Sequence, residues 1–259
     1  QKFDKKEYIW KNTIFLILAS YISPNFSLFI FYFAYHYLKK NNLVDLIPVY
    51  IFCLFCSFPV FYYFIILDIN FLMVNTPGTI TGENISLSFN FSDKILIISS
   101  IILFHFSPFI INKDFLYDTL KSLQKNIFFI GALFVLLVYF FNYQINYTGG
   151  GIFFQISNLF FKNNIFFYFI SFISLTFIFY LSKNSLCNLI IFCTLIISNI
   201  QNTIYHKYYD PLLMILFFSL INFPKKKDFF ERKYNILIIY LFYVLFIFSR
   251  IFKNILSTT

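Results

Sequence analysis

Charged residues are scarce in this chain, and their scarcity sets its class. Only 12% of the 259 residues are charged, whereas soluble proteins carry about a quarter. Hydrophobic residues make up 59% of the chain, and the mean hydropathy is +0.75. This composition excludes an ordinary soluble domain and predicts an integral membrane protein.

Cysteine and recognisable cofactor motifs are also sparse. The four cysteines, Cys53, Cys56, Cys187 and Cys193, all lie in apolar runs, which predicts inert thiols rather than a redox or zinc site. The chain has no Walker loop, dinucleotide fingerprint or metal-ligand cluster at a characteristic spacing, so we expect no cofactor and no metal. It lacks an initiator methionine as well, which indicates the later part of a longer protein.

Long apolar runs dominate what is present. They predict an all-α, polytopic integral membrane protein with about eight transmembrane helices, because barrel strands would need alternating residues instead. We expect Pro24 and Pro59 to kink or break the first two runs, Pro211 to sit in the first turn of the seventh, and Asp210 to cap it. The runs cover residues 13–37, 46–67, 95–111, 127–141, 165–181, 186–200, 211–223 and 234–252.

The basic residues are distributed unevenly between the connecting loops. Numbered along the chain, the odd loops contain eleven Lys and Arg and the even loops only three. Basic loops stay in the cytoplasm, so the even loops are expected outside, in a bacterial periplasm or the lumen of the endoplasmic reticulum. The net charge of +9 is then explained by topology, and we expect a lipid bilayer but no nucleic acid as a partner.

The even loops are the polar, glycine-rich ones. Gly82 belongs to the second loop, Gly149 and Gly150 to the fourth, and the sixth is QNTIYHKYYDP, residues 201–211. Glycine permits close approach of the backbone to a ligand, and loops carry function more often than buried elements do.

The sixth loop carries side chains suited to a phosphate and a sugar, namely Tyr205, His206, Lys207 and Tyr208. An interfacial tyrosine belt with a snorkelling lysine explains the same residues. His105 lies inside an apolar run and is interpreted as a packed side chain. Isolated carboxylates such as Glu83 are weak candidates for a base or a metal ligand.

Four blocks occur in the same order as in a known family. WKNTIFLI (10–17), TPGTITGENISLS (76–88), INYTGGGIFFQISNLFFKNN (145–164) and NTIYHKYYDPLL (202–213) resemble blocks in the C-terminal half of the GT-C glycosyltransferases. The resemblance is to the dolichyl-phosphate-glucose α-1,2-glucosyltransferase type in particular. Gly82 and Glu83 stand where Gly-Asp is usual, and Lys207 stands near an arginine of the family. The Asn-Arg-His of the third block is replaced by residues 148–151.

This resemblance implies that residues 1–259 are a single membrane domain, the C-terminal part of a longer GT-C-like protein. It implies a polyprenyl- or dolichyl-phosphate sugar as donor, a glycan as acceptor, and transfer on the outer side of the membrane. Binding would then involve Lys207, His206, Tyr205, Tyr208, Gly82, Gly149 and Gly150, and the family's catalytic acid would lie upstream of Gln1. A transporter or flippase for lipid-linked glycans and a non-catalytic membrane subunit are the alternatives.

Overall fold

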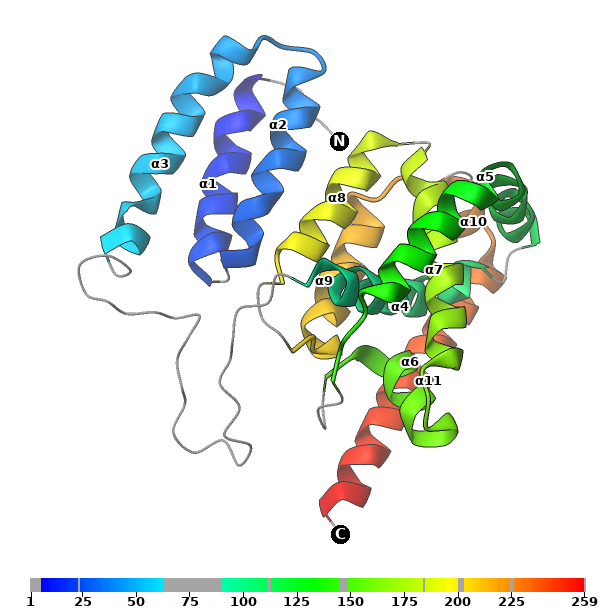
Figure 1. Cartoon of the computed structure of the whole chain (residues 1–259). Coiled ribbons are helices and arrows are strands. Elements are labelled where there is room, and N and C mark those ends of the chain that lie inside the picture. Colours follow the sequence, from blue (N-terminus) through cyan, green and yellow to red (C-terminus); the bar gives the residue numbers. More distant parts are fainter. Residues whose placement is uncertain are drawn as a thin grey trace.

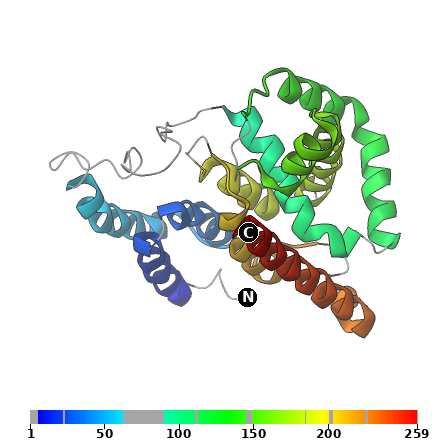
Figure 2. The same ribbon diagram turned by 90° about the horizontal axis from the view of Figure 1, so that it is seen from below.

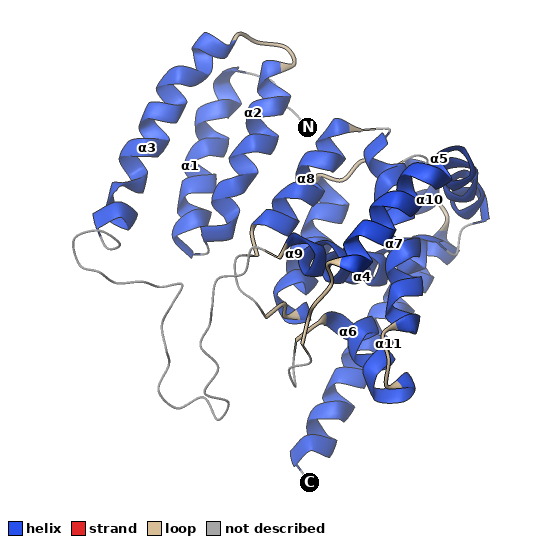
Figure 3. Ribbon diagram, viewed as in Figure 1, coloured by secondary structure: helices blue, strands red, loops and turns tan. Residues whose placement is uncertain are grey.

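The computed structural model describes residues 6–22, 24–62, 90–110, 113–144, 149–183, 185–199, 203–223 and 226–258. Throughout these ranges the regular elements are helices, and no strand occurs among them (Figures 1 and 3). The all-α class predicted from the apolar runs is therefore confirmed. The predicted site residues Gly82 and Glu83 lie outside the described residues.

Four helical segments in the described ranges are long and apolar enough to cross a membrane: Leu43–Phe61, Phe91–Phe109, Phe115–Tyr139 and Ile165–Lys183. Helices of this kind are typical of a membrane protein. The described ranges thus show four of the about eight expected spans, and the other apolar helices in them have only 10–17 residues. Hydropathy located the apolar runs but did not locate the ends of the helices within them.

The described residues between Lys6 and Phe61 form a small antiparallel unit. It consists of α1 (Lys6–Ile22), a 3-10 turn (Pro24–Phe29), α2 (Ile30–Leu38), a second 3-10 turn (Leu43–Leu46) and α3 (Ile47–Phe61). The first apolar run is thus broken at Pro24, as predicted, whereas α3 continues through Pro59. Figure 2 shows this unit beside the remaining helices, and α2 packs against α8 (Leu186–Ile197).

Helix α4 (Phe91–Ile110) is the centre of the larger body. It packs against α5 (Lys113–Tyr139), α6 (Gly151–Ile156), α7 (Ile165–Lys183), α8, α9 (His206–Ser219) and α11 (Lys233–Thr258). Residues in its middle, including Ile97, Ile98 and Ile101, have at most 1% of their surface exposed. A helix that is apolar on all sides is expected to be buried in this way.

Buried serines line the contact between α4 and α7. The Ser174 hydroxyl donates to Ser99 Oγ at 3.0 Å, and the Ser171 hydroxyl lies 3.4 Å from Leu96 O. Small residues let two helices approach closely, and their hydroxyls find partners without water. By contrast, α5 exposes large apolar side chains such as Phe128, as expected of a helix that faces lipid.

The end of α9 is held by a lysine from α10 (Lys226–Glu231). Lys226 Nζ donates to Phe217 O, Phe218 O and Ile221 O at 2.8, 3.2 and 3.1 Å. These carbonyls belong to or follow the last turn of α9, where helical partners are lacking and a cation is favoured. Burial lowers the pKa of Lys226. This contact fixes the C-terminal end of the helix whose other end carries the candidate site.

Candidate functional site

The fourth and sixth loops meet in the structure. Gly150 N donates to Ile204 O at 2.9 Å, and Ile204 N donates to the Tyr143 hydroxyl at 3.2 Å. The two loops are therefore neighbours in the fold, while their location on the outer side of a membrane stays a prediction. In Figure 1 the beginning of α9 and helix α6 also lie toward the same end of the molecule.

Two of the predicted site residues, Gly149 and Gly150, are tightly enclosed. A Cβ at Gly149 would lie 2.5 Å from Tyr143 Oη and 2.9 Å from Thr203 Cγ2. Gly150 has φ +88°, in the left-handed region, and a Cβ there would overlap the buried Phe154 ring. Glycine is thus required here by backbone conformation and by packing against the chain itself.

Helix α9 begins earlier than the sequence suggested. Its N-cap is Tyr205, in an extended conformation with no side-chain cap hydrogen bond, and His206 is its first residue. The prediction that Asp210 caps this helix is therefore wrong, as is the placing of Pro211 in its first turn. Because Pro211 lacks an N–H, it cannot donate to the carbonyl of Lys207 one turn earlier.

The remaining loop-six residues lie around this first turn. Lys207 is the second residue of α9, and Tyr208 is exposed. The Tyr208 ring stands edge-on to Tyr205, with their centroids 5.5 Å apart. Tyr209 is buried instead, and its hydroxyl oxygen accepts a hydrogen bond from Asn199 Nδ2 at 3.2 Å. The predicted residues Tyr205, His206, Lys207 and Tyr208 are thus grouped at one helix end.

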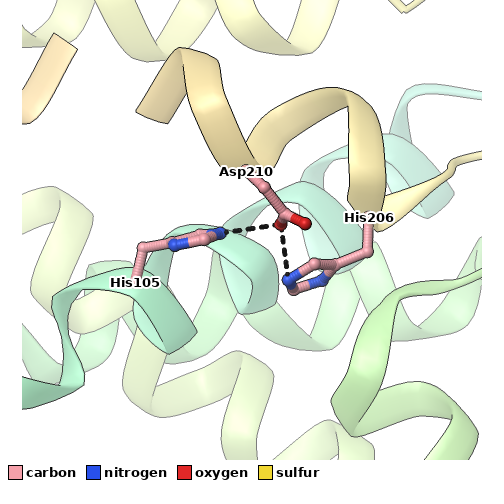
Figure 4. Close-up of side chains that lie close together, drawn as sticks. All are labelled: His105, His206 and Asp210. Atoms are coloured by element: carbon pink, nitrogen blue, oxygen red, sulfur yellow. Dashed lines mark hydrogen bonds and ion pairs between the residues drawn. The ribbon is translucent and has the colours of Figure 1, made fainter. Parts of the chain in front are cut away.

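The distinctive feature of the site is a His–Asp–His cluster (Figure 4). His105 Nε2 lies 3.1 Å from Asp210 Oδ1 in a hydrogen bond, although 105 positions separate the two residues. His206 precedes Asp210 by one helical turn, and its Nε2 lies 3.0 Å from the same oxygen. The contact of His206 with Asp210 is at ion-pair distance but does not have the geometry of a hydrogen bond. Both ring nitrogens of His206 are buried and make no hydrogen bond among the described residues.

Aromatic rings surround this cluster. The His105 and His206 rings stack at a centroid distance of 5.4 Å, and Phe104 and Phe246 flank His206 at 5.3 and 5.9 Å. The Tyr243 hydroxyl is 3.5 Å from His105 Nδ1. Helices α4, α9 and α11 each contribute residues to the cluster and its surroundings, so it forms only in the folded bundle.

Sequence reasoning missed the cluster because it treated its members separately. The interpretation of His105 as merely a packed side chain is incomplete, since it is both buried and hydrogen-bonded to a carboxylate. A signal was present in the His206 and Asp210 pair, because residues four apart face the same side of a helix. An ionisable residue inside an apolar run, such as His105, also indicates a partner on another helix.

Comparison of the chain with protein-family models, with curated proteins and with solved structures finds no match. The class established by the fold is that of an all-helical protein whose described residues include four helices of membrane-spanning length and composition. Any assignment of activity must therefore come from the chemistry of the residues themselves.

Proposed function

We propose that this chain is the membrane domain of a glycosyltransferase that uses a polyprenyl- or dolichyl-phosphate sugar on the outer, periplasmic or luminal, side of the membrane. The observation that supports this proposal is the contact between the Gly149–Gly150 loop and the segment that leads into α9. It groups phosphate-binding and sugar-stacking residue types at one end of an otherwise apolar bundle.

The first turn of α9 suits the phosphate of the donor. The N-terminus of a helix carries free backbone N–H groups and partial positive charge, and both favour an anion. Lys207 adds a formal positive charge in this turn. A phosphate bound here would leave its isoprenoid chain free to lie along the apolar surfaces of neighbouring helices.

The tyrosines and the glycine loop suit the sugar and the acceptor. Tyr208 is exposed beside Tyr205, and aromatic faces with hydroxyl groups are suited to sugar rings. The enclosed Gly149–Gly150 loop gives the adjoining surface a fixed shape. Inverting transfer requires a base that takes the proton of the acceptor hydroxyl as this oxygen attacks the anomeric carbon and the phosphate leaves. Within this chain, the variant Glu83→Gln tests whether the carboxylate suggested by the sequence acts as this base.

Replacing Lys207 by Ala tests the proposed donor site. A hydrogen bond to a charged group contributes about 1.5–3 kcal/mol, so we expect Lys207→Ala to raise the KM for the lipid-phosphate sugar about tenfold or more. The measurement is transfer of a radiolabelled sugar from a short-chain polyprenyl-phosphate donor to a glycan acceptor, with the full-length protein in proteoliposomes.

Lys183→Ala provides the matched control, because Lys183 is an exposed lysine in the last turn of α7. It removes the same charge away from the α9 turn, and its donor KM should match that of the unaltered protein. If Lys207→Ala transfers sugar with an unchanged donor KM, the proposed donor site is wrong. If the unaltered full-length protein transfers no sugar from any polyprenyl-phosphate donor, the transferase assignment itself is wrong.

A further inference from the structure

We infer that His105, His206 and Asp210 form a binding site for a divalent first-row transition metal, with Zn²⁺ as the expected ion. This inference rests on the geometry of the cluster and does not depend on the proposed transferase activity. It also departs from the sequence, whose spacing of residues predicted no metal.

The donor atoms match a known type of ligand set. Two imidazole nitrogens and one carboxylate oxygen bind zinc in catalytic sites, and the same combination binds iron in facial triads. Ligands with bond lengths of about 2.1 Å lie about 3.0–3.4 Å apart when they share a zinc ion. The Nε2–Oδ1 distances of 3.1 and 3.0 Å in the cluster agree with this separation.

The third distance in the cluster is also compatible with a shared ion. One ligand atom from each of the three residues lies within 4.8 Å of the others. His206 and Asp210 occupy adjacent turns of α9, so their spacing is set by the helix, while His105 approaches from α4.

His206 provides an independent indication of a ligand. Its two ring nitrogens are buried and make no hydrogen bond within the described part of the chain. A buried polar group without a partner costs about 1–3 kcal/mol. The ring is nevertheless directed at Asp210, as Figure 4 shows. Nε2 and Asp210 Oδ1 are at ion-pair distance without an aligned hydrogen bond, and a metal ion bound to both atoms would supply the directed contact that is missing.

The surroundings of His105 fit the role of a ligand. When Nε2 of a histidine binds a metal, Nδ1 carries the proton and usually donates it to an oxygen that orients the ring. Tyr243 Oη lies 3.5 Å from His105 Nδ1. The Phe104 and Phe246 rings lie beside His206, and the three cluster side chains are at most 14% exposed, which strengthens the attraction between a cation and the carboxylate.

The competing explanation is a proton-sharing ion pair without metal. Such a pair accounts for the aligned contact of His105 with Asp210. It accounts less well for His206, whose Nε2 lies 3.0 Å from the same oxygen, at ion-pair distance but outside hydrogen-bond geometry. A cation shared by the three donors accounts for both contacts.

Cobalt binding to the full chain tests the site. The protein is purified in detergent with a tag that contains no histidine, treated with chelator, and titrated with Co²⁺ while visible absorption is recorded. We expect about one Co²⁺ per chain, displaced by Zn²⁺, and binding weakened about 100-fold or more in His105→Gln and Asp210→Asn. His36→Gln is the matched control, since it removes a histidine in α2, near Cys187, and should leave the titration unchanged.

A second variant is expected to add an absorption band to the cobalt titration. In His206→Cys a thiolate would replace the imidazole, and Co²⁺ binding should produce a near-ultraviolet thiolate-to-cobalt charge-transfer band that the original protein lacks. This readout decides the matter even if the other cluster variants do not fold. The inference is overturned if the unaltered protein gives no stoichiometric Co²⁺ spectrum, if folded Asp210→Asn keeps it, or if folded His206→Cys shows no thiolate band.

Discussion

Gly150→Ala should lower the stability of this protein more than the size of the added methyl group suggests. At φ +88° an alanine is strained by about 1–2 kcal/mol, and its Cβ would also overlap the Phe154 ring. Because Phe154 is 1% exposed, its ring has little room to move away. We expect a total loss of about 3 kcal/mol or more, which corresponds to a melting temperature about 6–12 °C lower for a protein of this size.

Gly131→Ala is the control for this experiment, because it makes the same chemical change in an open position. Gly131 is inside α5, and apart from its chain neighbours and the nearby backbone of α5, no atom of the described residues lies within 4 Å of a Cβ built there. Alanine favours a helix over glycine by about 1 kcal/mol, so this variant should melt at the same or a higher temperature. Equal melting temperatures for the two variants would contradict the conformation assigned to Gly150.

The effect of Gly150→Ala should extend to the site. Gly150 N holds Ile204 O at 2.9 Å, and α9 begins two residues later with His206. A displaced Gly150 therefore shifts the segment that aims His206 at Asp210. In the cobalt titration, this variant should bind the ion more weakly although none of the three ligands has changed.

The sequence predicted those features that depend on local composition. The helical class follows from apolar runs too long for strands. The contact between the fourth and sixth loops was not predicted, because loop parity assigns each loop only to a side of the membrane. The helix ends were not predictable from hydropathy. Helix α5 begins at Lys113, in a stretch expected to be a loop, because Phe115 and Thr119 are buried four positions apart and give it a packed face.

Only part of the candidate site could be predicted from the sequence, because its residues come from distant parts of the chain. Loop six identified His206 and its neighbours, but Asp210 was interpreted as a cap because the proline after it suggested a helix start. The partner that corrects this interpretation, His105, comes from α4 and is 105 positions away. No periodicity links such residues, so only the packing of α4 against α9 brings them together.

Asn188→Leu should have the second large effect, because this side chain joins three parts of the chain. Asn188 is fully buried in α8; its Nδ2 donates to Leu181 O at 3.0 Å and to Asn222 O, and its Oδ1 accepts from Asn222 N at 2.9 Å. Leu181 is in the last turn of α7, where carbonyls lack helical partners, and Asn222 follows α9. Leucine would leave all three backbone groups without these partners.

Each hydrogen bond between membrane helices contributes only about 0.6 kcal/mol on average to the free energy of unfolding. Here the partners of Asn188 are backbone groups that no regular structure satisfies. We therefore expect Asn188→Leu to lower the free energy of unfolding by about 2–4 kcal/mol. The measurement is thermal unfolding in detergent. Asn158→Leu is the matched control, since Asn158 Nδ2 bonds only one turn back, to Phe154 O at 2.9 Å, and its loss should cost about 1 kcal/mol or less. Equal stability of the two variants would show that Asn188 does not tie α7, α8 and the end of α9 together.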